Sequence, residues 1–479
     1  MEHRFRGIPR GLIELEEIPT RRLREERVVH IDAWSSKAID AIVPLSLRIE
    51  LDGWARSYYT LQAHIDSIMQ YDRPKLPQPT NAAWNTTTQH VRTQFARMDK
   101  VQTLSYLQLD QVKWVRSSAA GYGYVGRKSD NDNYFRARKT AFTIAEKLNH
   151  DRDYGPLALE DSTPDIAFTR TQLCQIKVKR KIRNVWGEAF HYVLLEGLFA
   201  DPIIQHFIRN KSFYFIGEDP LLAVPRLVEE ILSEQDYVYM FDWSGFDASV
   251  QEWEIRFAFS LLESILIFPS SVESYIWHFI IELFIYRKIA APNGKVYLKT
   301  LGIPSGSCFT NIIGSIVNYV RIQYLFFRLT NNFVTVFTHG DDSLVGVSTT
   351  QYVQMDNFEP ICAEHNWTIN IAKSAVSHEA EGVSFLSRKV REHCHARDEL
   401  LCLRMLKFPE YVVESGAMST LRAHSIHQDA GINSRYLYSI YKYLLHRYGK
   451  ADSLPLNQQN WDPLEYENLR VSFATQNYE

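Results

Sequence analysis

The sequence predicts an α+β fold, because strand-forming and helix-forming patterns both occur along the chain. Residues 333–347 read as two strand-forming runs joined by a turn, with Gly340-Asp341 as the two-residue loop. Residues 237–241 read as a buried strand, and an amphipathic helix pattern begins near Ser249. A chain of 479 residues is too long for one hydrophobic core, so we expect two or three subdomains.

Composition and charge narrow the class of protein. The formal net charge is −3, so the chain is not basic overall, and any polyanion site must be a local basic channel. Its five cysteines are odd in number and lack paired spacing, which favours a reducing compartment. His393-Cys394-His395 with Cys402 could suggest zinc, but no second closely spaced pair accompanies them, so a structural role is favoured.

Neither a signal peptide nor a membrane span is predicted. The first residues are charged and lack the apolar run that a signal peptide needs. The most apolar run, residues 275–286, is short and contains His278 and Glu282, so we interpret it as a core helix. We therefore expect no membrane partner.

Residues 1–100 predict mixed helix and loop, broken by Pro74, Pro77 and Pro79, and carry no evident chemistry. The first informative stretch is 117–128, where three glycines let the backbone approach a ligand closely. Hydroxyls, tyrosines and two cations in this stretch could contact RNA. An ordinary flexible loop is the alternative, and composition alone favours it.

A run of cations follows at residues 177–186. If this run is a strand, its alternation places four cations on one face: Lys177, Lys179, Lys181 and Arg183. Like charges on one face repel one another unless a polyanion lies opposite them. Most charge runs are solvated surfaces, but a one-sided strand that ends in Val185-Trp186 favours phosphate binding.

Two carboxylates flank the turn that follows strand 237–241. Asp242 comes directly after the strand, at the C-terminal edge of the predicted sheet, and Asp247 follows a short turn. Ser249 and Glu252 form a capping-box pattern, which predicts that the next helix begins there. A single aspartate in such a place is often only a helix cap, whereas two of them could converge with the aspartates of the hairpin.

Residues 302–311 predict a tight loop of small residues before a long helix. The helix pattern has an apolar stripe that runs from Ile312 to Phe327. Backbone N–H groups and hydroxyls at a helix N-terminus can bind a sugar or a phosphate. A helix cap without a ligand is an equally good interpretation of this loop taken alone.

The hairpin carries two adjacent carboxylates, Asp341 and Asp342, which repel each other unless a cation or water screens them. A Gly-Asp-Asp tripeptide alone is a weak signal. Together with the upstream motifs it is specific, because their order and spacing resemble motifs A, B and C of viral RNA-dependent RNA polymerases. The matching residues are Asp242-x4-Asp247, Ser305-Gly306-x3-Thr310 and Gly340-Asp341-Asp342.

Weaker motifs of the same family occur in the expected order. Residues 117–128 resemble the template-strand loop, motif G, and residues 177–186 resemble the nucleotide-channel motif F. Asn370-Ile371-Ala372-Lys373 resembles motif D, and Phe385-Leu386-Ser387-Arg388 resembles motif E. The form of motif B and the compact length are most similar to partitiviruses, small double-stranded RNA viruses, and to their plant cryptic group. The resemblance covers roughly residues 117–388.

One position departs from the family pattern. Many relatives carry Asn four residues after the motif B threonine, where it helps to bind the ribose hydroxyl. In this chain the position is Gly314, followed by Ser315 and Asn318. The resemblance therefore leaves the means of sugar recognition open.

The resemblance implies a right-hand polymerase fold with fingers, a palm of antiparallel sheet packed on helices, and a thumb. The expected boundaries are 1–235 for the N-terminal part of the fingers with motifs G and F, 236–265 for the palm with motif A, 266–300 for a fingers insertion, 301–390 for the palm with motifs B to E, and 391–479 for the thumb. We expect a thumb helix that starts near Ser434 and stops at Gly449. The fingers would close onto the thumb to form a channel.

The implied activity is RNA-dependent RNA polymerisation, which replicates and transcribes a viral double-stranded RNA genome from NTPs by two-metal-ion nucleotidyl transfer. Mg²⁺ is the expected cofactor, with Mn²⁺ as a substitute, held by Asp242, Asp341 and Asp342. Lys373 could protonate the leaving group. The expected NTP contacts are Lys177, Lys179, Lys181, Arg183, Asp247, Ser305, Gly306, Thr310, Asn311 and Asn318.

The expected RNA contacts are Ser117, Ser118, Gly121, Tyr122, Arg127, Lys128 and Arg388. The implied partners are an RNA template, its product duplex, NTPs and viral capsid protein, in the virion interior and the host cytoplasm. The duplex would be gripped through its A-form backbone without sequence reading. A reverse transcriptase and an RNA-binding protein with an inactive palm are the alternatives. Nucleotide incorporation separates the second of these from both enzymes, and NTP or dNTP use separates the two enzymes.

Overall fold

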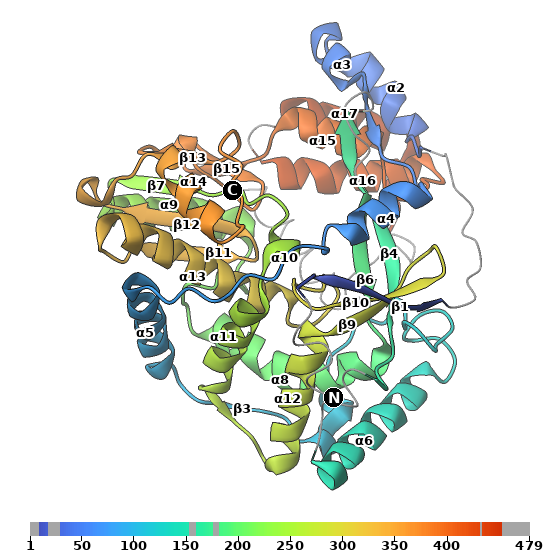
Figure 1. The fold of residues 1–479 in the computed structure, drawn as a ribbon. Helices are drawn as coiled ribbons and strands as arrows, with labels where there is room; N and C mark the ends of the chain where they lie inside the picture. The colour runs from blue at the N-terminus through green and yellow to red at the C-terminus, as the bar shows by residue number, and fades with distance from the viewer. Residues whose placement is uncertain (1–8, 18–28, 153–159, 176–181, 432–433, 453–479) are drawn as a thin grey trace.

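The computed structural model describes residues 9–17, 29–152, 160–175, 182–431 and 434–452 (Figure 1). Helices alternate with strands that are mostly antiparallel, so the predicted α+β class is confirmed. The central sheet has the strand order β11-β12-β7-β13, and each neighbouring pair is antiparallel. Its strands are β11 (Thr335–His339), β12 (Asp342–Val347), β7 (Tyr237–Met240) and β13 (Ala375–Ser377).

Both faces of this sheet are covered, because successive side chains of a strand point to opposite sides. On one side, Tyr239 packs edge-on against Phe326 of α13 (Thr310–Thr330). On the other side, Val238 and Met240 join a separate core with α9 (Pro220–Glu234). The helix α9 thus belongs to the sheet's own layers, although the sequence placed residues up to 235 in the fingers.

A second sheet of five strands has the order β1-β10-β9-β4-β6. Its strands are β1 (Leu12–Glu17), β10 (Lys295–Lys299), β9 (Arg287–Ala290), β4 (Asp165–Thr171) and β6 (Ile182–Gly187). The helices around the two sheets are α4 (Leu61–Met69), α5 (Ala82–Ala96), α6 (Asn133–Asp151), α8 (Phe190–Arg209), α10 (Phe246–Ser249), α11 (Glu252–Glu263), α12 (Ser271–Ile285) and α14 (Glu359–Glu364). Strands from residues 12–17 and 287–299 therefore share one sheet with the motif F strand.

Three small sheets complete the strand pairing. They are β14 (Ser384–Phe385) with β15 (Arg388–Arg391) and β16 (Cys394–Ala396), β2 (Trp54–Arg56) with β5 (Leu173–Gln175), and β3 (Val101–Gln102) with β8 (Leu266–Ile267). Leu386 and Ser387, which join β14 to β15, have φ values of +52° and +59°. Residues other than glycine adopt this left-handed backbone conformation at a cost in free energy, so the surrounding packing must stabilise the turn.

The expected thumb is a bundle of α15 (Glu399–Lys407), α16 (Gly416–Ala430) and α17 (Arg435–Tyr448), but it also contains the start of the chain. The helices α2 (Ala33–Ile42) and α3 (Leu45–Leu51) pack on this bundle, as Figure 1 shows. Ala38 and Ile39 share a core with Leu403 and Leu437. Residues 33–51, which the sequence assigned to the fingers, therefore bury their apolar side chains against the C-terminal helices.

Several helix predictions are confirmed. Residues 271–285 form a largely buried helix, and α17 ends at Gly449, whose φ of +66° suits glycine. The predicted capping box at Ser249 is wrong. Gln251 and Glu254 form the box at the start of α11, since Ser249 ends the short helix α10 and donates its hydroxyl to the Phe246 carbonyl.

Within the described residues, no helix is both long and apolar enough to cross a membrane. The five cysteines are free thiols, as their spacing predicted. The zinc alternative finds no support, because among described residues His393, Cys394, His395 and Cys402 do not form a group of metal ligands.

Asp32 connects α2 to the C-terminal bundle, and this connection yields a stability prediction. Its buried carboxylate accepts hydrogen bonds from Ser35 N (2.9 Å) and Ser419 Oγ (2.6 Å) and pairs with Arg422. We expect Asp32→Ala to lower the free energy of unfolding by about 3 kcal/mol, because it leaves the largely buried Arg422 guanidinium without a carboxylate partner. The measurement is urea denaturation.

The matched control is Asp40→Ala on the same helix. Asp40 pairs with Arg48 at 3.4 Å, and its side chain is 66% exposed, so its loss should cost less than about 1 kcal/mol. Equal effects of the two substitutions would contradict a buried connection at Asp32.

Candidate active site

The predicted hairpin is confirmed at the residue level. His339 at the end of β11 pairs with Asp342 at the start of β12, which leaves Gly340 and Asp341 as the two-residue loop. Gly340 has a φ of +62°, a backbone conformation that glycine adopts without strain. The turn therefore sets Asp341 at the tip of the hairpin, with Asp342 directly after it.

Asp242 lies beside this tip. The antiparallel register that pairs Val345 with Tyr239, extended past the end of β7, sets Asp342 opposite Asp242. The backbone of Asp242 is fixed on its other side, because its N–H donates to Ser374 Oγ (2.9 Å). The structure thus brings together the aspartates that the sequence predicted would converge.

Helix α13 holds the hairpin from below. The buried Asn318 donates from Nδ2 to the carbonyls of Gly340 (3.0 Å) and Asp341 (2.9 Å). Its Oδ1 accepts from Trp243 Nε1 at 2.9 Å. Ser315 Oγ accepts from the Gly340 N–H at 2.7 Å. Asn318, predicted to help bind the sugar, therefore has its amide engaged by the protein itself.

One cavity opens between the hairpin and the five-stranded sheet. The residues that line it are Ser67, Gln70, Tyr71, Arg183, Asn184, Trp243, Gly245, Phe246, Asp247, Ala248, Ser305 and Asp341. Four of them were predicted from sequence: Arg183, Asp247, Ser305 and Asp341. The cavity therefore unites motifs A, B, C and F around one space.

The carboxylates in and beside this cavity have raised pKa values. Burial, followed by repulsion from Asp341, raises the pKa of Asp247 to about 7, although Arg183 opposes the shift. Burial and the charges of Asp341 and Asp242 raise the pKa of Asp342 to about 6. Burial also raises the pKa of Asp341.

The donor set fits a divalent cation. Carboxylate oxygens are the ligands that Mg²⁺ prefers, and a cation would offset the burial and the repulsion that raise these pKa values. Within the described part of the chain, Asp242, Asp341 and Asp342 do not form a set with oxygens all within 4.8 Å of one another.

The motif B loop makes close contacts with the motif F strand. Ser305 Oγ accepts from Trp186 N at 3.4 Å, and a Cβ on Gly306 would lie 1.6 Å from the Trp186 carbonyl oxygen. Thr310 Oγ1 donates to the carbonyls of Pro304 (2.6 Å) and Ser307 (2.9 Å). The hydroxyl of Thr310, predicted to contact NTP, is therefore used within the loop.

The structure also places two further residues that were predicted to contact NTP. Asn311 Oδ1 accepts from the Tyr214 hydroxyl at 2.7 Å, outside the residues that line the cavity. Arg183 lies exposed on β6, directly opposite Arg170 of β4. Lys177, Lys179 and Lys181 fall outside the described residues.

The motif G loop is a small hairpin in which Ala119 pairs with Arg127. Tyr122 and Arg127 are exposed, and Ser118 donates its hydroxyl to the Val115 carbonyl (2.8 Å). Gly121 has a φ of +83°, and its Cα is packed against the Glu188 backbone. Ser117 is partly buried in the same turn.

Two of the predicted RNA-binding cations turn toward the protein. Burial lowers the pKa of Lys128, which lies near the acidic side chains of Glu188 and Glu196. Arg388 pairs with Asp429 of α16 at 2.6 Å and so links β15 to the C-terminal bundle. Lys373, by contrast, is exposed and lies in the turn before β13, next to Ser374, whose hydroxyl accepts from the Asp242 N–H.

Sequence reasoning missed Tyr71, which follows α4. Its hydroxyl donates to the Ile303 carbonyl (2.7 Å), and its ring packs edge-on against Trp186. Burial and the charge of Asp247 raise its pKa, so the hydroxyl stays protonated. No local pattern marks Tyr71, because its partners lie more than a hundred residues along the chain.

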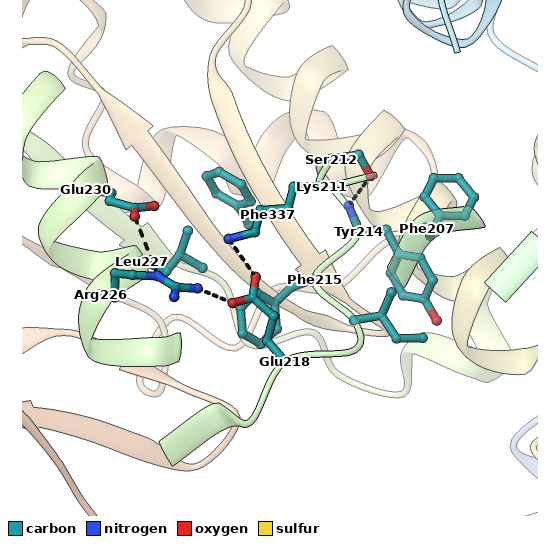
Figure 2. Close-up of a pocket in the computed structure, with 11 residues that line it drawn as sticks. Phe207, Lys211, Ser212, Tyr214, Phe215, Glu218, Arg226, Leu227, Glu230 and Phe337 are labelled. Atoms are coloured by element: carbon teal, nitrogen blue, oxygen red, sulfur yellow. Dashed lines mark hydrogen bonds and ion pairs between the residues drawn. The ribbon is translucent and has the colours of Figure 1, made fainter. Parts of the chain in front are cut away.

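A second hollow lies on the outer side of β11, between Phe337, Phe215 and Leu227 (Figure 2). Its one central carboxylate, Glu218, pairs with Lys211 and Arg226, so its charge is compensated. The hollow contains no predicted motif residue. We therefore assign the site to the cavity that Asp247 and Asp341 share.

The aspartates lie at the edge of an antiparallel sheet that packs on helices, and Arg183 of β6 lines the same cavity as two of them. This arrangement is typical of nucleic-acid polymerases of the right-hand class. The whole fold agrees, because it is similar to the Sicinivirus 3Dpol RNA dependent RNA polymerase with a TM-score of 0.71, at 12% identity, over 96% of this chain and 98% of that one. Residues 30–445 match the viral RNA-dependent RNA polymerase family. The chain belongs to that family.

Curated relatives match a shorter stretch. The genome polyprotein of Simian hepatitis A virus genotype V (isolate AGM-27) is 29% identical over 224 residues, which are 43% of this chain and 10% of the polyprotein. That of Human hepatitis A virus genotype IIA (isolate CF-53) is 28% identical over 212 residues, 41% of this chain and 9% of the polyprotein. The match therefore spans about a tenth of these relatives.

The raised pKa values predict how Mg²⁺ stabilises the fold at different pH. A carboxyl whose pKa is raised by folding contributes its stability at low pH and loses it as the pH rises through the folded value. Without a cation, Asp342 and Asp247 should therefore lower stability as the pH rises from about 4 to about 7. A bound cation offsets this loss, so the rise in Tm caused by Mg²⁺ should grow over the same interval.

Thermal unfolding at pH 5 and pH 8, with and without Mg²⁺, measures this effect. Asp342→Asn is the control, and its Mg²⁺-dependent shift should be smaller at pH 8. A shift of the same size at both pH values would contradict cation binding by these carboxylates.

Proposed function

We propose that the protein is an RNA-directed RNA polymerase that replicates and transcribes a viral double-stranded RNA genome from NTPs. One observation carries the proposal: Asp247, Ser305, Arg183 and Asp341, from four separate motifs, line a single cavity. An NTP in that cavity would meet a cation for its phosphates, polar groups for its sugar and carboxylates for metal ions.

Each residue then has a chemical role. Asp242 and Asp341 hold the divalent cations, Mg²⁺ or Mn²⁺, and Asp342 shares or tunes the site. Cations held by these carboxylates would supply activation of the primer 3′-hydroxyl and neutralisation of charge on the leaving pyrophosphate. Arg183 pairs with the triphosphate, and Asp247 accepts a hydrogen bond from the ribose. Lys373 gives a proton to the leaving group.

The finer assignment is a polymerase of the partitivirus type. The Gly-Ile-Pro-Ser-Gly-Ser form of residues 302–307 supports it. The RNA template and product duplex are its partners, with viral capsid protein around it in the virion interior, and the host cytoplasm is the second location. Copying of double-stranded as well as single-stranded RNA by the purified protein would test this assignment.

The activity itself is tested by removing a metal ligand. We expect Asp341→Asn or Asp242→Asn to lower nucleotide incorporation on an RNA template on the order of a thousandfold, because a lost ligand costs several kcal/mol of transition-state stabilisation. The assay uses purified protein, Mg²⁺ and labelled NTPs, with and without a primer. Circular dichroism and RNA binding serve as controls and should stay near those of the unaltered protein. Near-normal turnover in either variant would refute the metal assignment.

Sugar selection gives a second prediction, because Gly314 offers no side chain to the ribose. Asp247→Ala should lower the kcat/KM for an NTP while hardly changing that for its dNTP. An unpaired buried polar group costs about 1–3 kcal/mol, so discrimination should narrow by roughly tenfold to a hundredfold. The measurement is the ratio of the two kcat/KM values on one primed RNA. If both values fall together, Asp247 shapes the site without reading the sugar.

A further inference from the structure

A buried cluster of charges lies behind the motif B loop. Arg287 of β9 is fully buried, and its guanidinium pairs with Glu188 (2.7 Å), Glu196 (3.0 Å) and Asp165 (3.4 Å). The three carboxylates come from different parts of the chain: β4, the end of β6 and the middle of α8. Such a cluster costs desolvation energy, which its contacts with the rest of the fold must offset.

Glu196 faces two ways. Its Oε1 accepts from Arg287, whereas its Oε2 accepts from Ser307 Oγ (2.8 Å) and from the Cys308 N–H (2.7 Å). Both of these donors belong to the motif B loop. Glu196 therefore joins the buried arginine directly to the loop that carries Ser305.

The same loop is held at its other end by a buried lysine side chain. Lys299 of β10 lies opposite Arg287 in the β9–β10 hairpin. Its Nζ donates to the carbonyls of Phe284 (2.7 Å), Ile285 (2.9 Å) and Gly302 (2.7 Å). The loop is thus fixed at Gly302 and again at Ser307–Cys308, and Ser305 lies between these two attachment points.

A metal site is the competing explanation for this cluster. One donor atom each of Glu188, Glu196 and Cys308 lies within 4.8 Å of the others. The contacts of Glu196 oppose this explanation, because Arg287, Ser307 and Cys308 N already engage both of its oxygens. The guanidinium would also repel a second cation at this place. Support of the loop therefore explains more of the observed contacts.

We propose that Glu196 is a positioning residue for nucleotide addition. Its bonds to Ser307 and Cys308 fix the position of the motif B loop. The loop in turn places Ser305 in the cavity described above. Arg287 keeps the carboxylate turned toward the loop. The inference rests on the proposed polymerase function and assigns Glu196 no direct contact with substrate.

Glu196→Gln tests this role with little change in side-chain volume. A glutamine has one acceptor oxygen and one NH₂ group, so it cannot accept from Arg287 and from the loop at the same time. A displaced loop should raise the KM for NTP by about tenfold and change kcat less, because small misplacements at a binding site are costly. The NTP to dNTP preference should fall in the same variant.

Asp165→Asn is the matched control. It also removes a carboxylate partner of Arg287, but within the described residues Asp165 makes no hydrogen bond or ion pair with the loop. We expect it to lower Tm by a similar amount and to leave KM and sugar preference unchanged. Equal kinetic effects of Asp165→Asn and Glu196→Gln would overturn the inference, because a merely structural role moves both together.

Ser307→Ala provides a second test if Glu196→Gln folds poorly. It removes one hydroxyl donor and keeps the Cys308 N–H bond, so KM should rise by about threefold, between the unaltered protein and Glu196→Gln. An unchanged KM in Ser307→Ala would overturn the inference. Absence of incorporation by the unaltered protein would overturn the proposed function as well, so the two failures are distinguishable.

Discussion

Repulsion between carboxylates at the hairpin tip is the constraint on which the rest of the site depends. Asp341 and Asp342 are adjacent, and Asp242 follows the neighbouring strand. Their charges would push the hairpin tip away from Asp242 unless other residues held the backbone of the tip. Helix α13 supplies this support through Asn318 and Ser315, which bond to the backbone of the tip. The long buried helix and the two-sided packing of the sheet are what make that support rigid.

Gly314 belongs to the same arrangement. A Cβ at this position would lie 3.5 Å from the Gly340 Cα and 3.6 Å from a ring carbon of Phe246, which is ordinary contact distance. A longer side chain would have to turn away from Gly340, toward the cavity or into the core. The departure from the family pattern therefore lies directly beneath the hairpin, where α13 and the turn come closest.

The parts of the site that were predictable are those encoded over a few neighbouring residues. The hairpin with Gly340-Asp341, the strand before Asp242 and the helix after Thr310 each depend on local alternation and turn chemistry, and each is confirmed. The same holds for the α+β class. Tertiary partners were not predictable, because a sequence pattern does not show which distant residue meets a given side chain. Lys128 and Arg388 read as cations for RNA, but both face acidic partners of the protein.

The packing partners of α2 and α3 were not predictable, because their apolar residues show that a face is buried but not which helices bury it. One consequence of their position is mechanical. Arg56, just after α3, donates to the Phe408 carbonyl (3.0 Å) and to the Thr171 carbonyl (3.1 Å), and β2 around it pairs with β5. Residues 54–56 thereby connect the C-terminal bundle to strands β4 and β5. The bundle and these strands cannot separate at this point without breaking these bonds.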